Sequence, residues 1–158
     1  MQLASGGELM ERIIKSSHFS EKVASHYFRQ MCLAVQWCHE HNVVHRDLKP
    51  ENFLLESNAE RAVLKLTDFG LSCKIKSPDS VITDACGSAY YIAPEIFKQK
   101  YTKAVDIWAL GVILYLFPSG GVVSGGVCAR AQLLLHGRGR GACPPPPPTR
   151  MAGSFPWV

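Results

Sequence analysis

The chain has 158 residues, enough for one ordinary domain, and 47% of them are hydrophobic while 19% are charged, a balance that excludes wholesale disorder and fibrous repeats. Lys and Arg number 17 against 13 Asp and Glu, which gives a formal net charge of +4. That excess lies after residue 116, where four arginines stand without an acid, so we expect no nucleic-acid partner.

Membrane and secretory signals are weak. The most apolar stretch, residues 104–117, is interrupted by Asp106, which favours a buried helix over a membrane span. The first ten residues lack the basic start of a signal peptide, so we expect a cytoplasmic, reducing location. There the cysteines are expected to be thiols; they are Cys32, Cys38, Cys73, Cys86, Cys128 and Cys143.

Apolar periodicity predicts two helices near the start. Residues 8–15 form a short amphipathic stretch, with Leu9, Ile13 and Ile14 assigned to one face. Ser20 then serves as an N-cap for a long helix. The apolar positions of that helix recur every three or four residues: Val23, Tyr27, Met31, Ala34, Val35 and Cys38.

Short strands and a buried helix are predicted next. Residues 43–44, 53–55 and 63–66 are β-branched or apolar and are separated by polar turns. Residues 103–116 are apolar nearly all round a helix, which predicts central burial. The expected fold class is therefore mainly α (α+β), with a few short β-strands.

Composition divides the chain near Phe117. Eight of the 13 glycines and seven of the ten prolines lie after that residue, so we expect a domain over 1–116 and a disordered low-complexity tail over 117–158. The run Pro144 to Pro148 is a weak candidate ligand for an SH3 or WW domain, since such runs usually mark linkers. Alternatively, the tail derives from a retained intron or a shifted frame.

Three ordered motifs carry the chemistry. HRDLKPEN (residues 45–52) is followed by DFG (68–70) and APE (93–95), in the order and at the separations of the protein-kinase signatures. Residues 1–116 therefore resemble the C-terminal lobe of a eukaryotic Ser/Thr protein kinase, truncated at both ends. Lys49, two positions after the aspartate of the first motif, favours the Ser/Thr class over tyrosine kinases.

The resemblance implies ATP and Mg²⁺ as cofactors. Asp47 would orient the hydroxyl of a substrate Ser or Thr, and Lys49 would neutralise charge on the γ-phosphate. Asn52 and Asp68 would hold magnesium through oxygen ligands. Taken singly, each of these residues is equally a solvated loop group or a helix cap; the three motifs together favour the catalytic interpretation.

Further binding residues follow from the same resemblance. Backbone groups of Gln2 and Ala4 would meet the adenine, Leu54 would form its floor, and Glu8 would reach the ribose. Glu51 is similar to the acid that recognises a basic residue upstream of the phosphoacceptor. The implied partner is therefore a protein substrate whose Ser or Thr follows a basic residue.

Flanking segments point to a subgroup. GGEL (6–9), FLL (53–55) and GSAYY (87–91) resemble calcium-dependent and calmodulin-dependent protein kinases, with Ser88 in the substrate-binding loop. Residues 101–115 are shared more widely, including with cyclic-nucleotide-dependent kinases.

The activation segment, residues 68–95, departs from kinases that carry an activating phosphothreonine. Asp84 holds that place, and one hypothesis is that its carboxylate pairs with Arg46 instead of a phosphate. The alternative is a solvated loop acid. Candidate phosphorylation sites in the segment are Thr83, Ser80 and Ser77.

Scaffold roles are implied for four residues: His45, Glu95, Asp106 and Trp108. Asp106 would accept hydrogen bonds from the backbone around His45 and Arg46, because a buried carboxylate without donors is costly. Glu95 resembles an acid that pairs with a later arginine, and no matching segment follows.

Two alternatives stay open. The cysteines and histidines between Cys32 and His45 admit a zinc site, although they lack the usual paired-cysteine spacing, which favours core packing. The chain also starts at what resembles the hinge, without a glycine-rich loop or its partner lysine. We therefore expect little activity from the chain alone, and the alternative function is a non-catalytic fragment that binds a protein or competes for kinase substrates.

Overall fold

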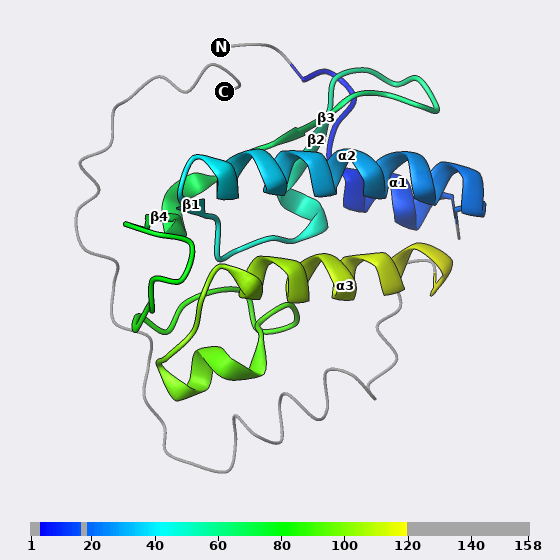
Figure 1. Cartoon of the computed structure of the whole chain (residues 1–158). Helices are drawn as coiled ribbons and strands as arrows, with labels where there is room; N and C mark the ends of the chain where they lie inside the picture. Colours follow the sequence, from blue (N-terminus) through cyan, green and yellow to red (C-terminus); the bar gives the residue numbers. More distant parts are fainter. Residues whose placement is uncertain (1–3, 17–18, 120–158) are drawn as a thin grey trace.

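The computed structural model describes residues 4–16 and 19–119. Three α-helices and four short strands make up this part, with 3-10 turns between them (Figure 1). The helices are α1 (Leu9–Lys15), α2 (Glu21–Glu40) and α3 (Ala104–Ser119). The strands are β1 (Val43–Val44), β2 (Phe53–Leu55), β3 (Leu64–Leu66) and β4 (Cys73–Lys74). The 3-10 turns are η1 (Pro50–Asn52), η2 (Phe69–Leu71) and η3 (Pro94–Lys98).

The strands form two small antiparallel ladders. β2 pairs with β3 in the register Phe53↔Leu66 and Leu55↔Leu64. β1 pairs with β4, with Val44 opposite Cys73. The first ladder places the end of the HRDLKPEN motif beside the start of the DFG motif, and the second brings the chain after DFG back to the strand that leads into HRDLKPEN.

α2 confirms the helix predicted from periodicity. The Ser20 side chain accepts a hydrogen bond from the backbone N–H of Val23 at 3.4 Å, as an N-cap does. Its buried positions follow the predicted spacing: Val23, Tyr27, Met31, Val35 and Cys38. In Figure 1, α2 lies alongside α3, and their facing apolar side chains form the centre of the core.

A second, smaller core lies under the activation segment. Val44, Ile82 and Tyr101 are buried there, together with Ile75, Ala93, Ile96 and Val105. Ile82 and Tyr101 are joined by an isolated antiparallel bridge. This cluster fixes the middle and the end of the activation segment against β1 and the start of α3.

The predicted burial of α3 on all sides is wrong. Ile113 is fully buried, yet Ile107 is 56% exposed, and three other large side chains lie on the same open side: Trp108, Leu114 and Tyr115. The physical reason is that α2 covers one face of the helix, and the described residues place no element over the other. Trp108, expected in the buried scaffold, is 43% exposed.

Two smaller predictions are also corrected, and one strand was missed. Ile14 is 59% exposed, so only Leu9 and Ile13 form the buried face of α1, because residues four apart share a helix face and the next position turns away. The β4 strand was not predicted, since two residues carry no detectable alternation. α3 continues to Ser119, three residues past the end that was predicted for this helix.

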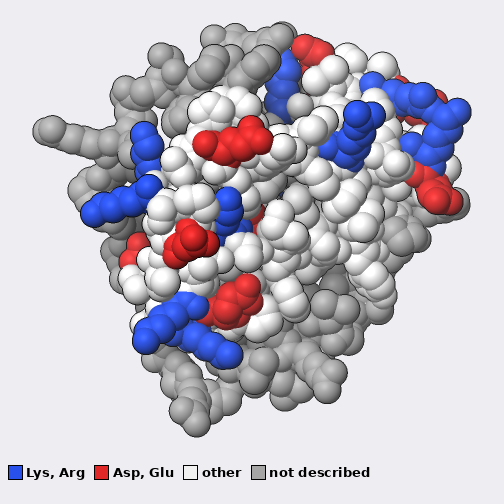
Figure 2. Space-filling view, in the orientation of Figure 1, with Lys and Arg blue, Asp and Glu red and all other residues white. Residues whose placement is uncertain are grey.

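Surface charge in the described part is mixed. On the face shown in Figure 2, basic and acidic side chains lie next to one another, and no field of one sign covers that face. No helix in residues 4–16 and 19–119 is long and apolar enough to span a membrane. Gln2, the proline run and the rest of the tail after Ser119 lie outside the described residues.

Candidate active site

His45 links the HRDLKPEN motif to the DFG motif. Its ring is fully buried and packs edge-on against Phe69, with ring centroids 4.9 Å apart. Nδ1 accepts from the backbone N–H of Asp47 at 3.3 Å, and Nε2 lies 3.1 Å from the carbonyl oxygen of Thr67. A carbonyl only accepts, so Nε2 carries the proton and the ring is neutral. Burial lowers the pKa of His45, in agreement with that neutral state.

Asp106 holds the backbone of the same motif from α3. Its carboxylate is 1% exposed and accepts from the N–H of His45 at 2.9 Å and of Arg46 at 2.8 Å. His39 Nε2 is a third contact, 2.8 Å from Oδ2. These are the backbone contacts that the sequence analysis expects of Asp106. They fix Arg46 in the left-handed region, at φ 68, where a non-glycine residue needs external support.

Asp47 is held on both carboxylate oxygens and is only 7% exposed. Oδ1 accepts from the backbone N–H of Ser88 at 2.8 Å and from its hydroxyl at 2.6 Å. Oδ2 accepts from Lys49 Nζ at 3.0 Å, and that ammonium also donates to Ser88 Oγ at 3.2 Å. Burial alone would raise the pKa of Asp47, but the hydrogen bonds from Ser88 and Lys49 outweigh it and lower the pKa.

The link between Ser88 and Asp47 was not foreseen from the sequence. The motif GSAYY assigned Ser88 to the substrate-binding loop, but nothing in the residue types indicated that its hydroxyl would touch a residue 41 positions earlier. The contact depends on how the activation segment returns to the HRDLKPEN motif. It makes Asp47, Lys49 and Ser88 one hydrogen-bonded group.

Asn52 and Asp68 are brought together by the β2–β3 ladder. The carbonyl of Asn52 accepts from the backbone N–H of Thr67 at 2.9 Å and from its hydroxyl at 3.1 Å. Asn52 Nδ2 donates to the carbonyl of Asp47 at 2.8 Å. Asp68, next to Thr67, is exposed, has φ 59, and its Oδ1 accepts from the N–H of Gly70 at 3.3 Å.

The segments that carry the two aspartates meet at His45, whose ring contacts the N–H of Asp47 and the carbonyl of Thr67, the residue before Asp68. The pKa of Lys49 is raised, first by its hydrogen bond to Asp47 and further by the charges of Glu51 and Asp68. Such influence fades quickly with distance. Asp68 thus adds to the negative charge that acts on Lys49, beside its direct partner Asp47.

The segment before α1 lies against β2. Gly6 donates to the carbonyl of Leu55 at 2.9 Å, and Glu8 forms a bridge with Leu54. A Cβ on Gly6 would sit 2.2 Å from the carbonyl oxygen of Ser57, so only glycine allows this close approach. Ala4, Glu8 and Leu54, the described residues assigned to adenine and ribose, thus share one edge, and Ala4 and Leu54 are half-buried there.

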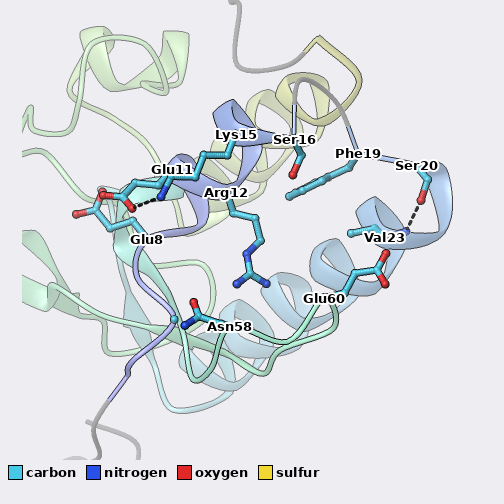
Figure 3. A pocket seen from close by; sticks show the side chains of 11 residues that line it. Glu8, Glu11, Arg12, Lys15, Ser16, Phe19, Ser20, Val23, Asn58 and Glu60 are labelled. Carbon is cyan, nitrogen blue, oxygen red and sulfur yellow. Dashed lines mark hydrogen bonds and ion pairs between the residues drawn. The ribbon is translucent and has the colours of Figure 1, made fainter.

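A groove of about 650 Å³ beyond Glu8 is a structural junction (Figure 3). Arg12 extends from α1 across it toward the turn that carries Asn58 and Glu60. Its guanidinium donates to Tyr27 Oη at 3.2 Å and to the backbone carbonyl oxygens of Ser57 and Ala59. Arg12 therefore ties α1, α2 and the β2–β3 turn together, a role that the sequence did not signal.

Arg46 is the centre of the activation-segment contacts. Its Nε donates to the carbonyl of Leu71 at 2.7 Å and its Nη1 to Tyr101 Oη at 3.3 Å. Asp84 Oδ2 lies 3.6 Å from Nη1, and the Tyr101 hydroxyl donates to the Asp84 carbonyl. The Arg46 side chain is 9% exposed and that of Asp84 78%. The pairing hypothesised from sequence is thus present, at the protein surface.

The remaining predicted residues are Glu51, Glu95 and Thr83. Glu51 Oε2 is buried and has no hydrogen-bond partner within residues 4–16 and 19–119. Glu95 lies half-buried on η3 and forms no ion pair with any described residue. Thr83 is exposed. In the described part of the chain, no group of three or more His, Cys, Asp or Glu side chains could hold a metal ion.

Comparisons with known proteins agree with this geometry. The family model for the protein kinase domain matches residues 1–126. Calcium-dependent protein kinases 21 and 29 of Arabidopsis thaliana are each 54% identical over 120 residues, and calcium-dependent protein kinase 26 of Oryza sativa subsp. japonica is 52% identical. The matched part is 76% of this chain and 22% of each relative. The chain thus spans about a fifth of these relatives' length, and it belongs to the protein kinase domain family.

Proposed function

We propose that this chain supplies the catalytic-loop and metal-binding part, the C-terminal lobe, of an ATP-dependent protein Ser/Thr kinase. The reaction would transfer the γ-phosphate of ATP to a Ser or Thr hydroxyl. The observation that carries this is the group formed by Asp47, Lys49 and Ser88, with the charge of Asp68 acting on the same ammonium.

Asp47 is suited to orient the attacking hydroxyl. Its lowered pKa keeps it ionised at neutral pH, so it can accept a hydrogen bond from a substrate Ser or Thr. The bonds from Ser88 and Lys49 hold the carboxylate in one orientation, and orientation is where phosphoryl transfer gains most. Lys49 brings a positive charge 3.0 Å from Asp47, where it would stabilise the transferring phosphoryl group.

The donor set fits magnesium with a nucleotide. The amide nitrogen of Asn52 donates a hydrogen bond to the carbonyl of Asp47, so the amide oxygen of Asn52 is left as the ligand atom. Asp68 offers an exposed carboxylate. Mg²⁺ usually takes one or two protein oxygens and completes its shell with phosphate oxygens and water. When bound, the ion would neutralise phosphate charge. Ala4, Leu54 and Glu8 would then lie along the adenine and ribose.

Glu51 is the proposed binding site for a basic residue of the substrate. Its Oε2 is buried without a hydrogen-bond partner in the described residues, and burying an unpaired carboxylate is unfavourable. An Arg side chain upstream of the phosphoacceptor would satisfy it with a charge-assisted bond. The proposed substrate is therefore a protein Ser or Thr with an upstream basic residue.

Asp84 would replace an activating phosphate. Its carboxylate lies 3.6 Å from Arg46 Nη1, and its carbonyl is held by Tyr101. In an active form that contains this chain, Asp84→Ala should lower turnover and Asp84→Glu should leave it unchanged. Full activity in Asp84→Ala would show that Asp84 is an ordinary loop acid.

The experiment compares the chain alone with a chimera. The chain is assayed for Mg²⁺-dependent ATP binding and peptide phosphorylation. Its residues 4–119 are then placed in calcium-dependent protein kinase 21 in place of the matching segment, so that the relative supplies both flanking parts, and this chimera is assayed again. We expect little turnover from the chain alone and measurable turnover from the chimera, abolished by Asp47→Asn and by Asp68→Asn. A folded chimera that binds ATP but phosphorylates no Ser/Thr peptide would refute the kinase proposal, and robust turnover by the chain alone, lost in Asp68→Asn, would refute the expected inactivity.

The alternative is a non-catalytic fragment that binds a protein. It is favoured by the open face of α3, which exposes Ile107 and Trp108, and by an adjoining groove of about 740 Å³ between α2 and α3 that is bordered by Phe28 and Leu110. Contiguous exposed apolar surface often marks a contact site. An inactive chimera together with competition by the chain for a kinase substrate would favour this second function.

A further inference from the structure

Two cysteines flank the side chain of Arg46. Arg46 is bonded on one side to the carbonyl of Leu71, two residues before Cys73, and on the other side to Asp84, two residues before Cys86. Both cysteines are partly exposed. Small reagents can therefore reach the region in which the two thiols lie.

The backbone brings both cysteines to the same motif. Cys73 lies directly opposite Val44 in the β1–β4 ladder, two positions before Arg46. Gly87, which follows Cys86, packs on Arg46 so closely that a Cβ there would lie 2.8 Å from the Arg46 carbonyl oxygen. The two cysteines thus approach Arg46 from separate parts of the activation segment.

Arg46 and the two cysteine thiols also influence one another electrostatically. Burial raises the pKa of the Cys73 thiol, Arg46 opposes that rise, and Cys86 adds to it. Arg46 in turn is influenced by both thiols. Thiolates are the reactive forms in disulfide exchange, and among the influences on Cys73 it is the Arg46 cation that favours the thiolate.

We propose that Cys73 and Cys86 form a modification site that takes an intramolecular disulfide beside Arg46 when the chain meets a small-molecule disulfide such as glutathione disulfide. One cysteine thiolate attacks a sulfur of glutathione disulfide, which forms a mixed disulfide and releases one glutathione. The other thiolate then attacks the protein sulfur of that mixed disulfide and releases the second glutathione. Two electrons and two protons pass from the cysteines to the reagent, which leaves as two glutathione thiols.

The described part of the chain also contains a natural comparison pair, Cys32 and Cys38. Both lie on α2, six residues apart, which corresponds to about 9 Å along the helix axis. Bridged cysteines have Cα atoms about 4.4 to 6.8 Å apart, so the intact helix forbids that disulfide.

The disulfide would close a ring over residues 73–86. The ring contains Asp84 and also Ser77, Ser80 and Thr83, the three candidate phosphorylation sites of the activation segment. The closed ring would hold residues 73 and 86 beside Arg46, and Asp84 could then move only a short distance away from that arginine. Neither ATP nor turnover is needed, so the test is independent of the proposed kinase activity.

Tryptic mapping tests the site directly. The full chain is equilibrated with glutathione and glutathione disulfide, quenched with acid, alkylated and digested without reductant. Cleavage at Lys65, Lys74, Lys76 and Lys98 puts Cys73 in peptide 66–74 and Cys86 in peptide 77–98, each with a single cysteine. Cys32 and Cys38 both fall in peptide 30–46. We expect peptides 66–74 and 77–98 to be recovered as one disulfide-linked species, while peptide 30–46 carries two alkylated cysteines.

The unfolded chain provides the control. In urea, the shorter loop favours a Cys32–Cys38 bridge over Cys73–Cys86, so the linkage should move to peptide 30–46. The proposal is wrong if the native chain gives only glutathione adducts on Cys73 or Cys86, or if the 66–74 to 77–98 species forms equally well in urea.

Single variants isolate the pair. Cys73→Ser and Cys86→Ser should each abolish the linked species, whereas Cys32→Ser should retain it, with near-ultraviolet circular dichroism used to verify that each variant folds. Cys128 and Cys143 lie outside the described residues, so the native experiment is repeated with both replaced by serine. Loss of the linkage in that double variant would mean that a tail cysteine takes part, and it would overturn the assignment.

Discussion

The backbone N–H of Arg46 donates to Oδ1 of Asp106 at 2.8 Å, although 60 residues separate the two. Oδ2 accepts from the neighbouring N–H of His45 at 2.9 Å. One buried carboxylate therefore sets the backbone of the residue before Asp47. The position of the candidate catalytic aspartate depends on α3 as well as on its own loop.

Asp106→Asn should destabilise the fold by about 2 to 3 kcal/mol. The amide keeps one oxygen acceptor but places an NH₂ group where the second oxygen was, so one of the backbone N–H groups of His45 and Arg46 loses its partner. The free energy of unfolding in urea measures the loss. Asp79→Asn is the matched control, since Asp79 is exposed and should change stability by less than about 0.5 kcal/mol. Equal stability of the two variants would refute the anchoring role of Asp106.

Tyr101 should make the protein sensitive to alkaline pH. Burial raises its pKa from 10.0 to about 12, although Arg46 opposes the rise. Between those values the unfolded chain loses the phenolic proton while the folded chain keeps it, so the free energy of unfolding falls as pH rises and is unaffected by this group below pH 10. Urea titrations across this range should show a shallower fall for Tyr101→Phe. Parallel curves for both proteins would contradict the prediction.

Ser88→Ala should raise the pKa of Asp47 toward its usual value, because the 2.6 Å bond from the Ser88 hydroxyl favours the ionised carboxylate. A lowered native pKa contributes stability that is present above the ordinary carboxyl pKa of 3.8 and is lost as pH falls through the native pKa. The variant should therefore lose less stability in acid than the parent. Carboxyl-carbon NMR titration of Asp47 reports the shift, and an unchanged pKa would mean that the backbone N–H of Ser88 and Lys49 suffice.

Two glycines offer a matched test of the activation segment. Gly87 has φ 120, and a Cβ there would lie 2.8 Å from the Arg46 carbonyl oxygen, whereas a Cβ on Gly111 would meet nothing within 4 Å. Gly87→Ala should cost about 1 to 3 kcal/mol through backbone strain and that clash. Gly111→Ala should stabilise α3 by up to about 1 kcal/mol, since alanine favours helix. Urea denaturation of both variants measures these changes in the free energy of unfolding. If Gly87→Ala left that free energy unchanged, the activation segment would not depend on its close packing against Arg46.

Local patterns in the sequence predicted the local features well. α2 was predictable because its N-cap, Ser20, and its apolar period both act within a few residues of chain. The contact of Asp106 with the HRDLKPEN motif followed from the resemblance and from the cost of burying a carboxylate. The motifs also named Asp47 and Asp68 as site residues, and His45 joins their segments through its contacts with the N–H of Asp47 and the carbonyl of Thr67.

Features that depend on what lies across the fold were not predictable. The bond from Ser88 to Asp47 spans 41 residues, and the tie from Arg12 to the carbonyl of Ala59 spans 47; neither leaves a periodic signal. β4 is defined by its register with β1 rather than by its own two residues. Exposure of α3 depends on which elements cover it, and an apolar helix carries no information about that.

Two isoleucines on α3 test the corrected picture of this helix. Ile113 is fully buried against α2, and Ile107 is 56% exposed on the open face. Ile113→Ala should lower the free energy of unfolding by about 2 to 5 kcal/mol, because it leaves a cavity in the core. Ile107→Ala should change it by less than about 0.5 kcal/mol, since the deleted atoms already contact solvent. The two variants share residue type, helix and substitution, so urea denaturation compares burial alone. A large loss in Ile107→Ala would mean that the open face is covered in solution, and the exposed surface assigned to α3 would then be an internal contact of the protein.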